Sequence, residues 1–212
     1  MKSERPLRVI FFKTDTGNEP VRDWLKALSS EDCKTIGTDI LSVQYAWPVG
    51  KPLVDNLGDG IWEVRSRLEN RIARTLFAVV NEEIILLHGF MKKQQKTPQN
   101  ELELAKKTEE AVRAKFMSKK NHRGGDFRDF LKEEGVLGEV EARALKQAMS
   151  LQISRLLKEK SITKAEMAVR MKTSRAAVDR LLNASNSSVT LNTLGKAARA
   201  LGRKVKIELV PA

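Results

Sequence analysis

The sequence predicts an α+β module followed by an all-α domain, and three observations lead to this fold class. Strand-like runs separated by turn signals occupy residues 61–90, whereas apolar residues at helical spacing dominate from Phe127 onward. The charge is divided in a similar way, because residues 1–116 carry 19 Lys and Arg against 17 Asp and Glu, whereas residues 117–212 carry 20 against 10. The 212 residues are enough chain for two small hydrophobic cores.

A strand and two helices are expected first. Bulky and branched residues predict the strand over Leu7–Lys13, and the turn-rich segment after it leads to Pro20, which suits a first helical turn. Apolar residues at helical spacing then follow: Val21, Trp24, Leu25 and Leu28. Ser29 or Ser30 can cap the second helix, which we expect to end at Trp47-Pro48 because the residue before a proline is disfavoured in the helical conformation.

Three strands follow in the predicted order, and together with the first strand they form a small twisted antiparallel sheet. Leu57–Gly60 is expected to be the turn that precedes them. The alternation after this turn places Arg65 and Arg67 on one face of the strand and apolar residues on the other. Residues 71–80 and 84–90 are the next two strands, each preceded by a polar turn.

A helix, a junction and a lone strand are expected on either side of the helical domain. Thr97 can cap a helix that begins at Pro98 and ends near Phe116. Residues 117–125 are polar, basic and glycine-ended, which indicates a linker. Residues 203–210 alternate as one amphipathic strand with no partner nearby in the sequence. Since a lone strand must pair with something, we expect it to pair with the other module or with a second copy of the chain.

Residues 162–182 have the pattern of a helix-turn-helix. Thr163 and Glu166, three positions apart, have the spacing of a capping box that starts a first helix. The turn follows at residues 172–173, and Ser174 can cap the second helix. The second helix has one apolar face, which predicts that it packs against the first; the residues of this face are Ala177, Val178, Leu181 and Leu182.

The composition argues against several classes of protein. Cys33 is the only cysteine, so no internal disulfide can form, which suits a reducing cytoplasm. With only His88 and His122 besides, a Cys/His zinc cluster is unavailable, and we expect neither a metal nor a cofactor. No apolar run approaches the roughly 20 residues needed to span a bilayer. The expected location is therefore the cytoplasm, without a membrane contact, and the apolar N-terminal stretch predicts a strand rather than a signal peptide.

The N-terminal module resembles a known toxin family. The matching elements lie in three stretches: Leu57–Arg65, Leu87–Lys93 and Lys96–Pro98. On these elements residues 5–115 resemble HigB-type toxins of the RelE superfamily. The resemblance implies a RelE-like fold and a metal-independent endoribonuclease that cleaves messenger RNA, usually on the ribosome. Toxins of this type often carry a tyrosine before the second-strand arginine, whereas Ala73 stands there in this sequence.

The implied chemistry requires positive charge on a sheet face. The RNA 2′-OH attacks the adjacent phosphate, so catalysis needs a proton acceptor, stabilisation of the transition-state charge and protonation of the leaving 5′-oxygen. Arginines and lysines of the basic sheet can stabilise that charge, and a lysine with a lowered pKa can transfer a proton. The resemblance favours five residues for these catalytic roles: Arg65, Arg71, Arg74, Lys92 and Lys93.

Simpler interpretations of the same residues stay open. A row of arginines is also typical of a solvated sheet face, on which Arg67 would pair with Glu69 or Glu83. His88 is a further candidate for proton transfer. It follows an apolar run on an expected core strand, however, which favours a packed and hydrogen-bonded histidine.

The helix-turn-helix resembles the Xre/Cro-type domains of HigA antitoxins over residues 149–201, with Lys172 where the turn glycine is usual. This resemblance and the net charge of the C-terminal half imply operator DNA as a partner. The expected DNA-binding residues are Lys164, Lys172, Ser174, Arg175, Ala176, Asp179 and Arg180. Arg175 can donate two hydrogen bonds to guanine, whereas the two lysines and Arg180 suit phosphates. A purely structural helical hairpin is the alternative.

Together the two resemblances predict a fused toxin–antitoxin protein. We expect a toxin domain over residues 1–116, a linker over residues 117–125 and an antitoxin over residues 126–212. The stretch MSKKNHRGG near Met117 looks like an antitoxin start. Helices within residues 126–157 are expected to neutralise the toxin by an intramolecular contact that covers the basic sheet or the helix after it.

The expected partners follow from this organisation. The toxin half would act on messenger RNA at the ribosome, while the antitoxin half would repress its own operon as a homodimer formed through the C-terminal domain. The alternative is a gyrase-inhibiting or inactive RelE-fold domain attached to a DNA-binding transcriptional regulator.

Overall fold

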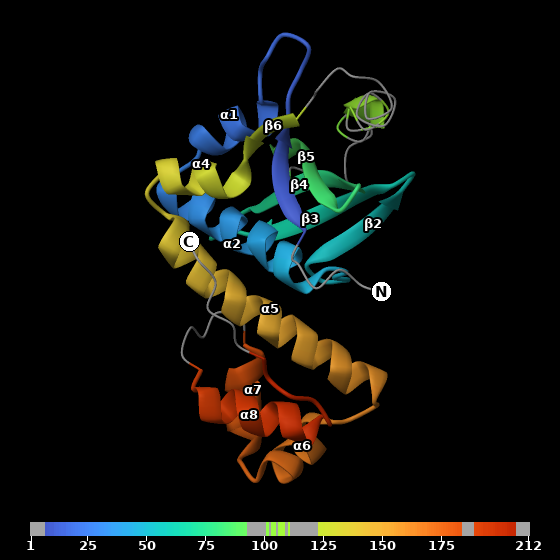
Figure 1. The fold of residues 1–212 in the computed structure, drawn as a ribbon, viewed down its shortest axis with the longest axis vertical. Helices are drawn as coiled ribbons and strands as arrows, with labels where there is room; N and C mark the ends of the chain where they lie inside the picture. Colours follow the sequence, from blue (N-terminus) through green and yellow to red (C-terminus); the bar gives the residue numbers. More distant parts are fainter. Residues whose placement is uncertain are drawn as a thin grey trace. The chain divides into compact units, whose positions relative to one another are not determined.

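The computed structural model describes residues 7–92, 123–183 and 189–206, together with seven helical residues between positions 101 and 110 (Figure 1). The chain divides into two compact units, Met1–Ala144 and Leu145–Ala212. The division lies within helix α5 (Leu137–Glu159) and therefore beyond the expected junction at residues 117–125.

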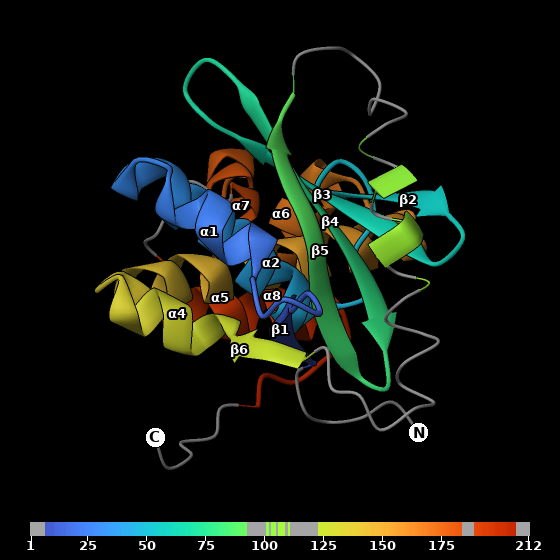
Figure 2. The same cartoon turned by 90° about the horizontal axis from the view of Figure 1, so that it is seen from above.

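A six-stranded sheet forms the centre of the first unit (Figure 2). Its strands, in the order in which they pair, are β2 (Val54–Gly58), β3 (Ile61–Arg67), β4 (Ile72–Val80), β5 (Glu83–Met91), β1 (Arg8–Phe12) and β6 (Arg123–Asp126). All neighbours are antiparallel except β1 and β5, which are parallel. Among the strands that were predicted, β3, β4 and β5 are antiparallel as expected, whereas β1 is parallel to β5. This pair differs because two helices intervene between β1 and the strands that follow.

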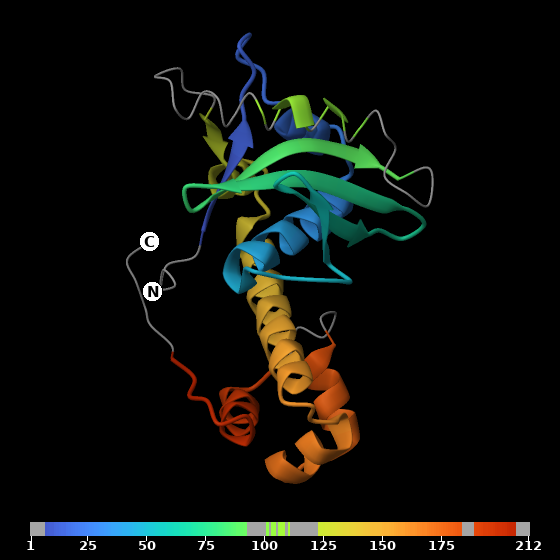
Figure 3. The same ribbon diagram turned by 90° about the vertical axis from the view of Figure 1, so that its right-hand side faces the viewer.

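The two helices after β1 agree with the sequence prediction. Helix α1 (Pro20–Lys26) begins at its proline, and helix α2 (Ser30–Ala46) ends directly before Trp47-Pro48. Ser29 caps α2 by accepting a hydrogen bond from the amide of Asp32, at 3.2 Å. Figure 3 shows α2 running along one face of the sheet.

Two strands were not predicted from the sequence. β2 ends in the stretch that was expected to be only a turn, because the turn is confined to residues 58–60. β6 lies in the expected linker. Its Gly124 approaches the neighbouring strand so closely that an added Cβ would lie 2.8 Å from the carbonyl oxygen of Phe11. Gly124, one of the two glycines that suggested a linker, is therefore needed for a close backbone contact within the sheet.

Helix α4 (Phe127–Glu133) and the first turns of α5 complete the core of this unit. The rings of Phe127 and Phe130 meet the ring of Phe11 edge-on, with centroids 5.6 and 5.5 Å apart. An added Cβ on Gly37 of α2 would lie 3.1 Å from Leu131 and 3.3 Å from Val140, so α2 and these helices pack closely. This packing explains why the first unit extends to Ala144.

The free cysteine is part of the same packed region. Cys33 lies near the start of α2 and is 5 % exposed. Burial raises the pKa of its thiol to about 11, and the nearby charge of Glu134 contributes to the rise. The thiol is therefore neutral at physiological pH, which suits a packing role and not a reactive one.

The second unit is helical. After the last turns of α5 it contains α6 (Lys164–Met171), α7 (Arg175–Leu182) and α8 (Leu191–Ala200). Its core is formed by apolar residues from all four helices, among them Leu157, Met167, Val178, Leu181 and Ala197. Of the expected strand at residues 203–210, residues 203–206 are not in a strand, and the rest lies outside the described part of the chain.

We expect the replacement Phe130→Ala to lower the free energy of unfolding of the first unit by about 3–5 kcal/mol, because it removes a fully buried ring from the contact with β1. Lys132→Ala, an exposed change on the same helix, should alter it by about 0.5 kcal/mol or less. Denaturant unfolding monitored by circular dichroism measures both values. Equal stability of the two variants would show that α4 is not part of this core.

Candidate functional sites

The strand register divides the sheet into two faces. Phe11 pairs with Leu86, Leu86 with Phe77, and Phe77 with Trp62, so these residues share the face on which the helices pack. The opposite face carries Asp55 opposite Glu63 and Arg65 opposite Arg74, followed by His88 on β5. We call this second surface the arginine face.

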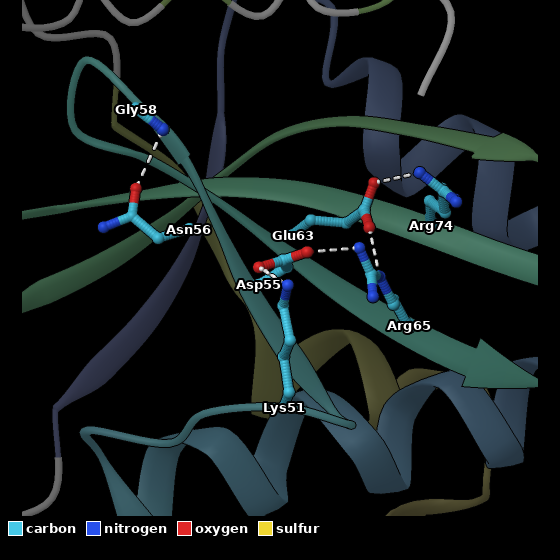
Figure 4. Close-up of polar contacts among 7 residues, drawn as sticks. All are labelled: Lys51, Asp55, Asn56, Gly58, Glu63, Arg65 and Arg74. Carbon is cyan, nitrogen blue, oxygen red and sulfur yellow. Dashed lines mark hydrogen bonds and ion pairs between the residues drawn. The ribbon is translucent and has the colours of Figure 1, made fainter. Parts of the chain in front are cut away.

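The arginine face holds a network of alternating charges (Figure 4). The carboxylate of Glu63 accepts hydrogen bonds from Arg65 Nε at 2.5 Å and from an Nη of Arg74 at 2.7 Å. Arg65 also donates to Asp55 at 2.5 Å, and Lys51 lies 3.2 Å from the same carboxylate. Three positive and two negative side chains leave the network a formal charge of only +1.

Burial separates the roles of the two arginines. Glu63 is fully buried and Arg74 is 3 % exposed, so their ion pair is part of the folded core. Removing one partner of such a pair costs about 3–5 kcal/mol because the other charge stays buried. The side chain of Arg65 is 31 % exposed. Of the two arginines, Arg65 is therefore the one that can meet a ligand, whereas Arg74, also a predicted catalytic residue, is buried.

The charges of the network support one another. Burial acts to raise the pKa of the Asp55 carboxyl, but the hydrogen bond and charge of Lys51 and the charge of Arg65 outweigh it and lower that pKa. The pKa of Arg65 is raised, mainly by its hydrogen bond to Glu63. Asp55 and Arg65 are consequently charged at neutral pH, so a phosphate approaching Arg65 would meet the carboxylate of Asp55 as well.

The other predicted catalytic residues are only partly brought together. Arg71 pairs with Asp32 at the start of α2, away from the arginine face. Lys92 follows β5, and its amide donates a hydrogen bond to the carbonyl of Ile72 at 2.7 Å. It lies four positions after His88, so the alternation of the strand places Lys92 on the same face as His88. Lys93 lies outside the described residues.

His88 occupies a half-buried position on the arginine face. Its Nε2 lies 2.5 Å from a carboxylate oxygen of Glu101, and its ring stacks on Phe90 with centroids 5.7 Å apart. Glu101 belongs to a described part of the helix that was expected after Pro98. The hydrogen-bonded histidine expected from the sequence is therefore present, and its position beside the network was not foreseen.

The single tyrosine does not replace the one that the toxin resemblance would require. The hydroxyl oxygen of Tyr45 lies 3.2 Å from Glu141 and accepts a hydrogen bond from Arg128 at 3.0 Å. Tyr45 thus belongs to the interface among α2, α4 and α5. Burial is the largest cause that raises the pKa of its hydroxyl.

The helix-turn-helix forms as predicted. Thr163 and Glu166 make both hydrogen bonds of a capping box, at 3.2 and 2.8 Å, and Ser174 caps α7. Lys172 ends α6 in the left-handed conformation, with φ 51° and ψ 56°. This is the position at which glycine is usual, because a side chain raises the energy of that conformation.

All seven predicted DNA-binding residues lie at the surface of the second unit. Asp179 is half-exposed and the other six are exposed. The ammonium of Lys164, at the start of α6, lies 2.6 Å from the carboxylate of Asp179 on α7. The face thus presents positive side chains at the start of each helix and one ion pair between them.

Lys146 is a residue that sequence reasoning missed. It is 4 % exposed, and its ammonium donates to the hydroxyl of Ser150 at 3.1 Å and to the carbonyls of Leu181 and Asn183 at 3.0 and 2.8 Å. These carbonyls end α7, where positive charge is favourable. Burial lowers the pKa of Lys146. The sequence shows only one more lysine in a basic helix, because its acceptors lie 35 and 37 positions away.

Comparison with known families agrees with the two units. Residues 23–110 match the family described as Phage derived protein Gp49-like (DUF891), a RelE/HigB-like toxin family. Residues 152–206 match the Cro/C1-type HTH DNA-binding domain. A search of curated proteins found no significant match. The chain therefore joins a toxin-type domain to a DNA-binding domain. These matches do not assign the two domains to the HigB and HigA families in particular.

Two further kinds of feature are absent from the described part of the chain. No group of three or more His, Cys, Asp or Glu side chains there is arranged to hold a metal ion. None of its helices is both long and apolar enough to cross a bilayer.

We expect Lys146→Met to destabilise the second unit by about 1–3 kcal/mol, since the buried end of α7 loses charged hydrogen bonds. Lys158→Met, an exposed change on the same helix, should have an effect of about 0.5 kcal/mol or less. Thermal and denaturant unfolding provide the comparison. A Lys146→Met protein that is as stable as wild type would mean that desolvation of the ammonium offsets its hydrogen bonds.

Proposed function

We propose that this protein is a toxin–antitoxin-type fusion that represses its own transcription by binding operator DNA. The observation that carries the proposal is the exposed face of α6 and α7, in a domain that matches Cro/C1-type DNA-binding domains. A structural hairpin alone would not need seven polar or small residues exposed at the positions from which such domains contact DNA.

The charge of the second unit supports a polyanionic partner. Residues 145–212 carry 14 Lys and Arg against 4 Asp and Glu, whereas residues 1–144 carry 25 against 23. The excess of ten positive charges therefore belongs to the DNA-binding unit alone. Contacts to phosphates supply affinity and orientation, while a side chain such as Arg175 supplies base recognition in the major groove.

We expect Arg175→Ala to remove discrimination at one base position, at a cost of roughly 1–3 kcal/mol. Lys172→Ala should weaken all duplexes similarly and reduce the salt dependence by about one unit, because it removes a phosphate contact. Gel-shift titration of the chain's own upstream DNA, over a range of salt concentrations, measures both effects. A dimer should protect two half-sites about 34 Å apart.

One result would contradict this assignment of residues. Wild-type protein that binds the upstream DNA no better than random duplex would make the helix-turn-helix a structural element. Lys172→Gly is the matched control, because it removes the same charge but relieves the left-handed backbone. It should lose the same affinity as Lys172→Ala while the domain becomes more stable by about 1 kcal/mol.

We further propose that the first unit is directed at RNA and is held in a quiescent form. The toxin-family match and the placement of Arg65, His88 and Lys92 on one face of the sheet support cleavage of the RNA backbone. In that reaction Arg65 would stabilise charge on the phosphate, and His88 or Lys92 would transfer a proton. The carboxylates of Glu63 and Asp55 oppose it, because they compete with phosphate for Arg65.

The packing of α4 differs from the expected covering of the basic sheet. The apolar cluster of Phe127, Phe130 and Leu131 does have an intramolecular partner, but that partner is Phe11 and α2 on the helix-covered face. Residues 123–144 therefore complete the fold opposite the arginine face.

We expect residues 1–116, expressed alone, to arrest growth and cleave messenger RNA, because this fragment contains the arginine face without the antitoxin half. Arg65→Ala or Lys92→Ala should relieve both effects, whereas Lys26→Ala, an exposed change on α1, should not. Arg74→Ala is unsuitable, because it would leave Glu63 buried without a partner from β4. Growth curves and mapping of RNA 5′ ends are the measurements, after circular dichroism has shown that each fragment folds.

Residues 1–144 provide the matched control, since they retain β6 and α4. Cleavage by both fragments would show that residues 117–144 do not neutralise the toxin. Growth arrest with intact messenger RNA would favour a gyrase-type target. Two folded fragments with no effect on growth would leave an inactive toxin-type domain attached to a DNA-binding regulator.

A further inference from the structure

Asp179 is an acidic residue at a position where most side chains suit a polyanion. It lies on the exposed side of α7, one helical turn after Arg175, and its side chain is 47 % exposed. Of the four acidic residues in the second unit, Glu166 caps α6 and Glu159 pairs with Arg155 on α5. Near DNA phosphates a carboxylate is repelled, so Asp179 weakens non-specific binding unless it makes a contact of its own.

The neighbouring charges keep this carboxylate ionised. The hydrogen bond from Lys164 is the largest cause that lowers the pKa of Asp179, and the charge of Arg175 acts in the same direction. An ionised carboxylate only accepts hydrogen bonds. It is therefore attracted by base edges that present an amino group and repelled by those that present acceptors.

Lys164 reduces the repulsion between the Asp179 carboxylate and the phosphates of DNA. Its ammonium contacts Oδ1 of Asp179 at 2.6 Å and neutralises the carboxylate locally. Among the described residues, no hydrogen bond joins the second carboxylate oxygen, Oδ2, to another side chain. The pair thus combines a half-exposed acceptor with a compensating positive charge.

We propose that Asp179 is a specificity-determining residue that selects cytosine in the operator, by accepting a hydrogen bond from its N4 amino group. The inference rests on the proposed DNA binding. Cytosine fits better than adenine, whose amino group lies beside the N7 acceptor, and better than guanine or thymine, which present acceptors at the corresponding position. The favoured base is thus the one whose major-groove edge offers a donor alone.

The spacing along α7 adds a prediction about the operator. Arg175 and Asp179 are four residues apart, about 6 Å along the helix axis, whereas base pairs are about 3.4 Å apart. The two side chains therefore reach different base pairs, one or two steps apart. Each half-site should contain a guanine recognised by Arg175 and a cytosine recognised by Asp179 at that separation.

Binding-site selection from a randomised duplex library tests the proposal with the full-length protein. The variants are Asp179→Asn and, as a matched control, Glu159→Gln, which removes an exposed carboxylate from α5. Wild type and the control should select cytosine at one position of each half-site. Asp179→Asn should select adenine there, because an asparagine amide can bind N6 and N7 of adenine together.

Two duplexes that differ only by cytosine or adenine at this position quantify the effect. Wild type should prefer cytosine roughly 5- to 150-fold, and Asp179→Asn should lose or reverse this preference. Lys164→Ala should bind more weakly yet keep the preference for cytosine. Thermal unfolding tests whether each variant is folded. We expect all of them to fold, because the replaced side chains lie at exposed or half-exposed helical positions.

The outcomes separate this inference from the proposed function. Specific binding by wild type, with an unchanged base profile in Asp179→Asn, would overturn the role of Asp179 and leave operator binding intact. Uniformly tighter binding by Asp179→Asn would overturn it too, since Asp179 would then act only by repelling phosphates. A wild-type protein that selects no sequence would contradict operator binding itself.

Discussion

The first unit depends on a constraint at strand β1. This strand lies inside the sheet, with β5 on one edge and β6 on the other, and the ring of Phe11 is fully buried. In a module made of residues 1–116 alone, one edge of the strand and one side of that ring would lack their covering. Unpaired backbone groups and exposed apolar surface are both unfavourable. β6 and α4 cover them, and for this reason the compact unit extends to Ala144.

The arginine face follows a related principle, because its strongest charges are satisfied within the sheet. Glu63 is buried between two arginines, and the pair that it forms with Arg74 belongs to the core. Of the two arginines, Arg65 is the one that reaches solvent, and it does so while bound to two carboxylates. Because its arginines are already paired with carboxylates, this sheet suits a quiescent toxin-type domain better than an open cluster of unpaired cations would. The family match thus describes the ancestry of the fold, whereas the geometry describes the present state of its charges.

In the second unit, different lysines serve affinity for DNA and the orientation of α7. Its excess of positive charge is spread over the surface, where it suits a polyanion, whereas one lysine is withdrawn from that surface. Lys146 binds the carbonyls at the end of α7 and thereby connects the helix that would enter the major groove to α5. The turn between α6 and α7 carries a strained backbone at Lys172, where a glycine would be more favourable. A positive side chain beside the DNA backbone is a reason for a lysine at that position, since it exchanges conformational stability for a phosphate contact.

The sequence by itself determined the features that depend on local chemistry. These include the start of α1 at Pro20, the caps of α2, α6 and α7, the alternation of β3 and the exposed face of the helix-turn-helix. It also indicated the basic residues of both candidate sites, because charge and family resemblance are visible without coordinates. Only the tertiary structure decided which of those residues come together. Arg65 and Arg74 meet through Glu63, Arg71 turns to α2, and Lys146 finds acceptors more than 30 positions away. The glycines of β6 resemble a linker in the sequence because their close contact with β1 comes from a strand more than 100 residues earlier, and no local pattern records such a contact.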